Sequence, residues 1–315
     1  MRHTPLCHYP LLPPLWQRGE MRLLMTPALK GHLLAFITIT IWSSTFIISK
    51  WLLDQMVPLQ ILLGRFIIAI IFLSIIHPRF KKPVSLREEL LFLAIGTALA
   101  SYFVFENSAL RWTYSSNVSL IVATIPFMTG ILSRLVYKTP FFTLQGVIGL
   151  VTAYLGVLII IINGSQLEGV EPIGDLLAIG AAVMFAVYSV FMLKTGSAYT
   201  LIQLTRKVFV YGFFALSLML AVSGVAIIPE SLTGQGFASL IYLGIVASSL
   251  AFIFWNRAIQ AIGPVKTNQY IYLIPVMTTL FAALFLHEPI TWLTIAGAAM
   301  ILAGLYLSEK SRSNL

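Results

Sequence analysis

Ten apolar stretches follow one another from residue 32 almost to the end of the chain. A helix needs about 20 predominantly apolar residues to cross the roughly 30 Å hydrocarbon core of a bilayer. Because lipid offers the backbone no hydrogen-bond partners, such stretches are predicted to form helices and not open strands. The predicted spans are residues 32–53, 57–77, 89–110, 114–136, 143–163, 173–194, 204–226, 236–258, 264–286 and 290–308.

The composition supports a membrane location for these stretches. Hydrophobic residues make up 58% of the chain and charged residues 10%, whereas a soluble domain has about 25% charged residues. The net charge of +9 lies mostly in the short gaps between spans, as is typical of charges that orient membrane helices, so nucleic-acid binding is not expected. The single cysteine, Cys7, excludes an internal disulfide framework and a multi-cysteine metal cluster, and we expect no cofactor and no metal.

Part of the chain occurs twice. Residues 98–138 align without a gap to residues 247–287, and the coinciding pairs include Phe103/Phe252, Phe105/Phe254, Asn107/Asn256, Ala109/Ala258, Ile125/Ile274, Pro126/Pro275, Met128/Met277 and Thr129/Thr278. Each copy belongs to a set of five predicted helices, and because five is odd, the copies enter the membrane from opposite sides. Such inverted repeats enclose a central site that opens to either side in turn. The sequence therefore predicts an all-α integral membrane protein of ten transmembrane helices in two inverted five-helix repeats.

Positive charge in the gaps predicts the orientation of the chain. Lys and Arg gather before the first span and in every second gap after it, for example in residues 79–87. Cytoplasmic loops retain such charges, so both termini are expected to be cytoplasmic. The expected divisions are a poorly structured N-terminal extension (1–31), a first repeat (32–163), a second repeat (173–308) and a cytoplasmic tail (309–315). Because residues 1–20 are broken by prolines and have no helical period, we hypothesise that translation starts at Met21 or Met25 and not at Met1.

Short motifs in both halves resemble one family of membrane transporters. In the first half they are Ile41-Trp42-Ser43-Ser44-Thr45-Phe46 with Lys50, Pro58 followed by Arg65, and Ala109-Leu110-Arg111-Trp112-Thr113 leading to Pro126. In the second half they include Trp255-Asn256-Arg257-Ala258, Pro275 and Glu288-Pro289-Ile290-Thr291. Across residues 33–308 their order and spacing are similar to those of EamA-type transporters of the drug/metabolite transporter superfamily. Thr139 stands where the first half of such proteins commonly has an acid like Glu288.

The resemblance implies a function and a place in the cell. Members of that family move small metabolites, often amino acids, by alternating access in the bacterial inner membrane. The first, third, fourth, sixth, eighth and ninth spans resemble the wall of their cavity. We therefore expect a multi-pass inner-membrane transporter that exports amino acids or related zwitterions. Phosphorylated or nucleotide-type metabolites are the alternative substrate class.

Polar side chains within the spans mark the candidate substrate site. A charged group at mid-bilayer costs about 2.5 to 3.5 kcal/mol, so polar residues in spans normally face the interior of the bundle. Small-molecule sites also favour aromatic walls, which supports the inclusion of Trp42 and Tyr188. The candidate substrate-binding residues are Trp42, Ser44, Thr45, Tyr102, Asn107, Asn117, Tyr188, Ser189, Ser248, Trp255, Asn256, Asn268 and Tyr272.

Several charged residues have both a functional and a structural interpretation. Glu106 is a candidate for proton coupling, but it lies five residues before Arg111, and we favour pairing or snorkelling at the external end of its span. Arg65 is a candidate for anion attraction, but we favour a structural cation bonded to carbonyl groups. Lys266 is the better candidate for attracting an anionic substrate. Glu288 is expected at the start of the last helix, where an acid favours the positive helix end.

Pro126 and Pro275 lie within spans, where a proline kinks a helix. Each is a candidate hinge beside the cavity or a fixed bend. A membrane-embedded enzyme is the alternative from another class, but the chain has neither an HExxH motif nor a phosphate-binding GxxxxGK(S/T) loop. The expected partners are a small-molecule substrate and the lipid bilayer, without nucleic acid. A homodimer is compatible with the sequence but is not required.

Overall fold

The computed structural model describes residues 26–137, 144–164, 171–192, 194–195, 199–262, 267 and 269–313. These residues form helices joined by loops, with no strand among them. The elements in chain order are α1 (Pro27–Leu52), α2 (Pro58–Ile76), α3 (Leu86–Trp112), α4 (Ser115–Val122), α5 (Ile125–Tyr137), α6 (Leu144–Gly164), α7 (Pro172–Met192), α8 (Leu201–Ser223), α9 (Gly234–Ile241), η2 (Tyr242–Leu250), α10 (Ala251–Ile262), η3 (Gln269–Tyr272), α12 (Leu273–Phe285) and α13 (Trp292–Ser313). Of these, η2 is a π-helix and η3 is a 3₁₀-helix.

The described part of the chain has the helices of a multi-pass membrane protein. Seven of them are long and apolar enough to cross a bilayer, and one of the seven runs from Gly234 to Ile262 through α9, η2 and α10. Two shorter apolar helices cover Tyr270–Phe285 and Trp292–Gly304. The prediction of one continuous helix over residues 114–136 is wrong, because α4 ends at Val122 and α5 begins at Ile125.

The chain interrupts its helices directly before the two prolines that the repeat shares. Pro126 is the second residue of α5, and Pro275 is the third residue of α12, which follows the 3₁₀ turn η3. A proline has no N–H and its ring clashes with the preceding turn, whereas the first turn of a helix needs no such donor. The two spans therefore restart at the prolines and do not bend smoothly through them.

Polar side chains at the loop ends fix where several helices begin. Thr26, Ser85 and Thr233 each accept a hydrogen bond from the backbone N–H three residues further on. This bond satisfies one of the donors that the first turn of a helix leaves free. At the start of α2 there is one free donor fewer to satisfy, because Pro58, the first residue of the helix, has no N–H.

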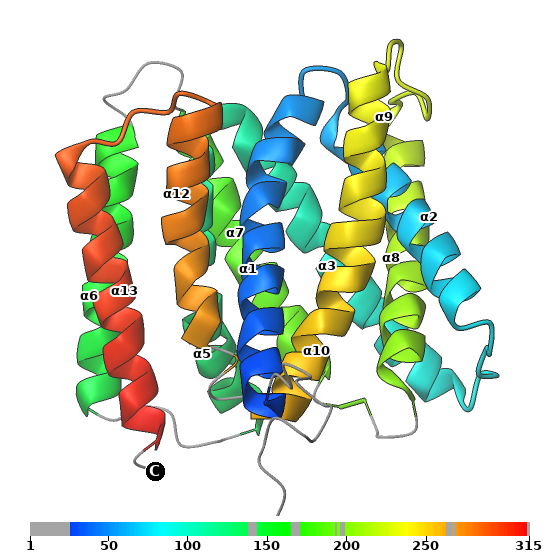
Figure 1. Ribbon diagram of the computed structural model, residues 1–315, viewed down its shortest axis with the longest axis horizontal. Coiled ribbons are helices and arrows are strands. Elements are labelled where there is room, and N and C mark those ends of the chain that lie inside the picture. Colours follow the sequence, from blue (N-terminus) through cyan, green and yellow to red (C-terminus); the bar gives the residue numbers. More distant parts are fainter. Residues whose placement is uncertain are drawn as a thin grey trace, which may run out of the picture.

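The helices of the two sequence halves interlock. α1 packs mainly against α10 and α12, and α7 packs mainly against α3 and α5. In Figure 1, α1 lies in the middle of the bundle, and α6 and α13 stand as a pair at one side. α1 begins and α13 ends at the same end of the bundle (Figure 1), which we call the near end; the opposite end is the far end.

α6 and α13 approach each other closely at glycines. A Cβ at Gly156 would lie 2.7 Å from the carbonyl oxygen of Gly297, and a Cβ at Gly304 would lie 2.4 Å from that of Gly149. Small residues at such contacts let two backbones meet, as is common between membrane helices. This contact joins one helix from each half of the chain.

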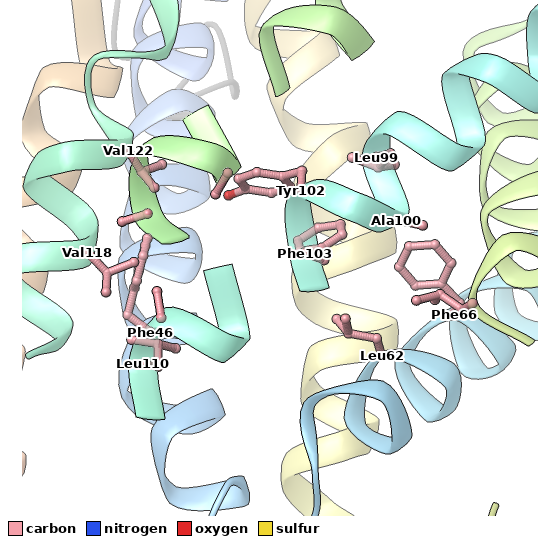
Figure 2. Packing of buried hydrophobic residues seen from close by; sticks show 14 of the residues in the cluster. Phe46, Leu62, Phe66, Leu99, Ala100, Tyr102, Phe103, Leu110, Val118 and Val122 are labelled. Carbon is pink, nitrogen blue, oxygen red and sulfur yellow. The ribbon is translucent and has the colours of Figure 1, made fainter. Parts of the chain in front are cut away.

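A large buried apolar cluster surrounds α3. In Figure 2, Tyr102 and Phe103 lie between two groups of this cluster, with Phe46, Leu110, Val118 and Val122 on one side and Leu62, Phe66, Leu99 and Ala100 on the other. The ring of Phe66 packs edge-on against Phe103, with the ring centroids 5.8 Å apart. α3 is therefore packed on both sides, which holds Tyr102 and Phe103 in place.

Candidate functional site

A cavity of about 150 Å³ lies among helices of both halves. Its walls are formed by α1, α2, α3, α4, α5, α7, α10, η3 and α12 and are mostly apolar or aromatic. The lining residues are Trp42, Thr45, Phe46, Arg65, Tyr102, Phe103, Glu106, Ser119, Val122, Ala123, Ile125, Phe185, Phe252, Ile271 and Ile274. An apolar cavity with a few polar groups is the usual form of a small-molecule site.

Three pairs of lining residues are equivalent positions of the internal repeat. They are Phe103 and Phe252, Val122 and Ile271, and Ile125 and Ile274. The cavity therefore lies where corresponding parts of the two halves face each other. In transporters built from repeats, the substrate site is found at such an interface.

Arg65 reaches the cavity from α2, about two turns after the helix begins. The residue is 3% exposed, and its Nε donates a 2.5 Å hydrogen bond to Oγ of Ser248. The guanidinium carbon lies 4.3 Å from the ring centroid of Phe103, where a cation is attracted by the aromatic face. The structure thus differs from the interpretation of Arg65 as a cation bonded to carbonyl groups: a hydroxyl and an aromatic ring hold it at the cavity wall.

The π-helix η2 brings Ser248 to Arg65. A π-helix is wider than an α-helix and occurs frequently at functional sites. Within η2, Oγ of Ser249 donates to the carbonyl oxygen of Gly244 at 3.0 Å. Gly244 also permits the close approach of η2 to α2, because a Cβ there would lie 2.5 Å from Cγ2 of Ile68 and 3.1 Å from the carbonyl oxygen of Arg65.

Glu106 contributes the second charge to the cavity wall. It is 6% exposed, and its Oε1 accepts a 2.5 Å hydrogen bond from the hydroxyl of Tyr102, one helical turn earlier on α3. The expectation that Glu106 pairs with Arg111 or snorkels is wrong, because Glu106 is buried at the cavity and Arg111 is exposed. One side of α3 faces the cavity at Tyr102, Phe103 and Glu106, whereas Arg111 lies beyond it near the end of the helix.

Trp42 closes another side of the cavity and is held by the second half. Its Nε1 donates to the carbonyl oxygen of Ala247 at 3.3 Å. Its ring centroid lies 5.3 Å from that of Phe252 and 5.2 Å from that of Trp255. These contacts place one aromatic face at the cavity in a fixed position, as a binding wall requires.

The cavity brings together some of the predicted site residues and excludes others. Trp42, Thr45, Tyr102, Arg65 and Glu106 line it. Ser248 and Trp255 lie behind the wall and contact the lining residues Arg65 and Trp42. The predicted residues that do not line it are Ser44, Asn107, Asn117, Tyr188, Ser189, Asn256 and Tyr272. Among them, Ser44 forms a hydrogen bond with Tyr242, and the three asparagine amides donate to atoms one helical turn earlier. Lys266 and Asn268 lie outside the described residues.

Reasoning from polar residues missed most of the apolar wall. Phe46, Phe185 and Ile271 line the cavity, and nothing in their local sequence separates them from other apolar residues of a membrane helix. The repeat did mark Phe103 and Phe252, because both copies keep a phenylalanine there. Among the described residues, no group of three or more His, Cys, Asp or Glu is arranged as a metal site.

A second cluster of charges lies at the far end of the bundle. Glu288, in the loop between α12 and α13, is 7% exposed and accepts hydrogen bonds from the backbone N–H groups of Ser115 and Ser116, at 2.7 and 3.1 Å. The hydroxyl of Ser116 donates to the same carboxylate at 2.9 Å, and Nζ of Lys50 lies 3.2 Å from it. Lys50 Nζ also donates to the carbonyl oxygen of Thr113 at 2.9 Å. We call this cluster of Lys50, Ser115, Ser116 and Glu288 the far-end latch.

The latch corrects the role expected of Glu288. An acid is favoured at the positive end of a helix, but the helix that Glu288 caps is α4 of the first half, whereas α13 begins later, at Trp292. His287 has a φ of 55°, in the left-handed region, and this turn aims Glu288 back into the bundle. Glu288 thereby ties the α12–α13 loop to α1 and α4.

Comparison with known proteins gives one family and several relatives. The EamA-like transporter family matches residues 29–162 and 172–309. An uncharacterized transporter of Archaeoglobus fulgidus is 27% identical over 284 residues, which cover 89% of this chain and 97% of that protein. A probable amino-acid metabolite efflux pump of Escherichia coli is 26% identical over 290 residues, which cover 89% and 94%. One solved crystal structure is similar in fold, with a TM-score of 0.60 at 19% identity over 89% of this chain and 96% of that one.

Proposed function

The chain belongs to the EamA-like transporter family, and we propose that it carries amino acids or related zwitterions out of the cell by alternating access around its central cavity. Family membership makes it a small-molecule transporter and not an enzyme, and its apolar helices make it a multi-pass protein of the inner membrane. The observation that carries the substrate class is the pair of opposite charges, Arg65 and Glu106, on one otherwise mostly apolar cavity wall.

The proposed architecture is two inverted five-helix repeats with both termini in the cytoplasm. The two segments that the family matches, 29–162 and 172–309, support this division of the chain. The exchanged contacts of α1 and α7 also support it, because each packs on helices of the other half. With the near end cytoplasmic, the latched far end faces outward, and we propose that Pro126 and Pro275 are the hinges at which the spans flex.

Zwitterions fit the cavity better than phosphorylated metabolites do. A phosphate group carries up to two negative charges and is usually held by several cations or by helix N-termini. The cavity wall offers Arg65 for this purpose and sets the carboxylate of Glu106 beside it. The efflux direction is supported by the Escherichia coli relative, which is named a probable amino-acid metabolite efflux pump.

Counterflow in proteoliposomes tests this function. Vesicles preloaded with one unlabelled amino acid are expected to accumulate the same labelled amino acid from outside faster than vesicles without protein, and to release it chemically unchanged. Sugar phosphates serve as the competing class in parallel vesicles. Accelerated exchange of sugar phosphates with no accelerated exchange of any amino acid would overturn the proposal.

A further inference from the structure

We infer that Arg65 and Glu106 are two separate subsites, one for the carboxylate and one for the ammonium group of a single α-amino acid whose side chain is apolar. This inference rests on the proposed function and adds to it the placement of the substrate. It starts from the incomplete hydrogen bonding of the two buried charges.

Both charged groups keep unused hydrogen-bonding capacity towards the cavity. A guanidinium has five N–H donors, and within the described residues Arg65 uses its Nε alone, on Ser248. A carboxylate has two acceptor oxygens, and within the same residues Glu106 uses Oε1 alone, on Tyr102. Buried charges are normally paired and fully hydrogen-bonded, so these two are arranged for partners that the protein does not supply.

The two charges do not form a direct ion pair, although each lies within electrostatic range of the other. Ion pairs with a nitrogen–oxygen distance within 4.0 Å join Lys50 to Glu288 and Lys207 to Glu89 among the described residues, and none joins Arg65 to Glu106. Both residues nevertheless line the same cavity, from the neighbouring helices α2 and α3. A zwitterion supplies a directly bonded counter-charge to both groups at once, which neither an amine nor an acid can do.

Ser248 sets the direction in which the guanidinium faces. By accepting from Nε, it leaves the terminal nitrogens of Arg65 for a ligand, and these two nitrogens form the planar fork that binds a carboxylate with two parallel bonds. Phe103 packs against the guanidinium and limits its rotation. Ser248 is therefore a positioning residue, and Arg65 is the residue that contacts the substrate.

The rest of the wall defines the side-chain subsite. Phe46, Phe185, Phe252, Ile271 and Ile274 line it without adding a charge. A charged substrate side chain would lose its hydration there and find no counter-charge beyond the two already engaged. The cavity is thus suited to amino acids with apolar side chains, such as leucine and phenylalanine.

The inference is tested with matched analogues of one substrate. Binding to detergent-purified protein is measured by calorimetry for L-phenylalanine, for phenethylamine, which lacks the carboxylate, and for 3-phenylpropionate, which lacks the ammonium group. The unsubstituted protein is expected to bind the amino acid at least about tenfold more tightly than either analogue. L-Aspartate and L-lysine are expected to bind at least about tenfold more weakly than L-phenylalanine.

The two substitutions have opposite expected signatures. Arg65→Gln should remove the protein's preference for L-phenylalanine over phenethylamine. Glu106→Gln should remove its preference for L-phenylalanine over 3-phenylpropionate. The inference is overturned if both variants lose the same affinity for all three compounds, or if the two preferences survive both substitutions. If the unsubstituted protein exchanges amino acids in counterflow while these signatures fail, the proposed function stands and the subsites are wrong. If it exchanges none, the proposed function itself fails.

A milder substitution keeps the test informative if either charge variant fails to fold. Ser248→Ala leaves both charges in place. It is expected to weaken the binding of L-phenylalanine and of 3-phenylpropionate several-fold while leaving the binding of phenethylamine unchanged. Ser249→Ala is its matched control, because that neighbouring hydroxyl bonds Gly244 within η2 and not Arg65. Identical binding of all three compounds by the two serine variants would contradict the assignment of Ser248.

Discussion

Glu288→Ala is expected to open the far end of the bundle. The carboxylate of Glu288 bonds Ser115, Ser116 and Lys50, so its removal leaves two backbone donors of α4 without their acceptor and the ammonium group of Lys50 without its counter-charge. Removing one partner of a buried pair costs about 3–5 kcal/mol, and because the Lys50 side chain is 28% exposed we expect about 1–3 kcal/mol here. Since about 1.4 kcal/mol is a factor of ten, the population open at the far end should rise about 5- to 150-fold.

Thiol labelling measures this opening. Ala123 lines the cavity, and in a background without Cys7 the substitution Ala123→Cys gives a single reporter thiol. With Glu288→Ala added, a membrane-impermeant reagent supplied at the far end should label Cys at this position about ten times faster. Counterflow should fall in the same variant, because a carrier that rests open at one end completes fewer cycles.

Glu230→Ala is the matched control for the far-end latch. Glu230 is also an acid in a far-end loop, between α8 and α9, but its side chain is exposed. Its removal should leave both the labelling rate and counterflow unchanged. Equal labelling rates in the two acid variants would show that the latch does not hold the far end closed.

Gly244→Ala is expected to reduce substrate binding about tenfold or more. The added Cβ would lie 2.5 Å from Cγ2 of Ile68, a β-branched residue that cannot rotate away easily, so η2 and α2 must separate. This separation lengthens the bond from Arg65 to Ser248, and a hydrogen bond to a charged group contributes about 1.5–3 kcal/mol. Overpacking should also lower the stability of the protein by about 1–3 kcal/mol.

Calorimetry and thermal unfolding in detergent separate these two effects. Affinity for L-phenylalanine should fall while affinity for phenethylamine, which does not need Arg65, stays unchanged. Gly64→Ala is the control on α2, next to Arg65, because its Cβ would meet Leu240 of α9 at 3.5 Å, an ordinary contact. Unchanged affinity in Gly244→Ala would mean that the approach of η2 to α2 does not position Arg65.

The charged residues show how far the sequence predicted the site. It identified Arg65 and Glu106 as costly charges within spans, but it favoured structural roles for both. Arg111 was the nearest countercharge to Glu106 along the chain, whereas the fold places Glu106 at the cavity and leaves Arg111 exposed. Glu288 was correctly recognised as a helix-capping acid, but the helix that it caps lies in the other half of the chain.

The sequence by itself determined the class of the protein and its internal repeat. Span length, apolar composition and repeated motifs are local properties, and a bilayer leaves few alternatives to helices. The tertiary structure decided which side chains meet, because this depends on helix register, on the π-helix η2 and on the interruptions before Pro126 and Pro275. Arg65 with Ser248, and Glu288 with α4, are contacts between residues far apart in the chain. No local pattern specifies such contacts, and the cavity and the latch both depend on them.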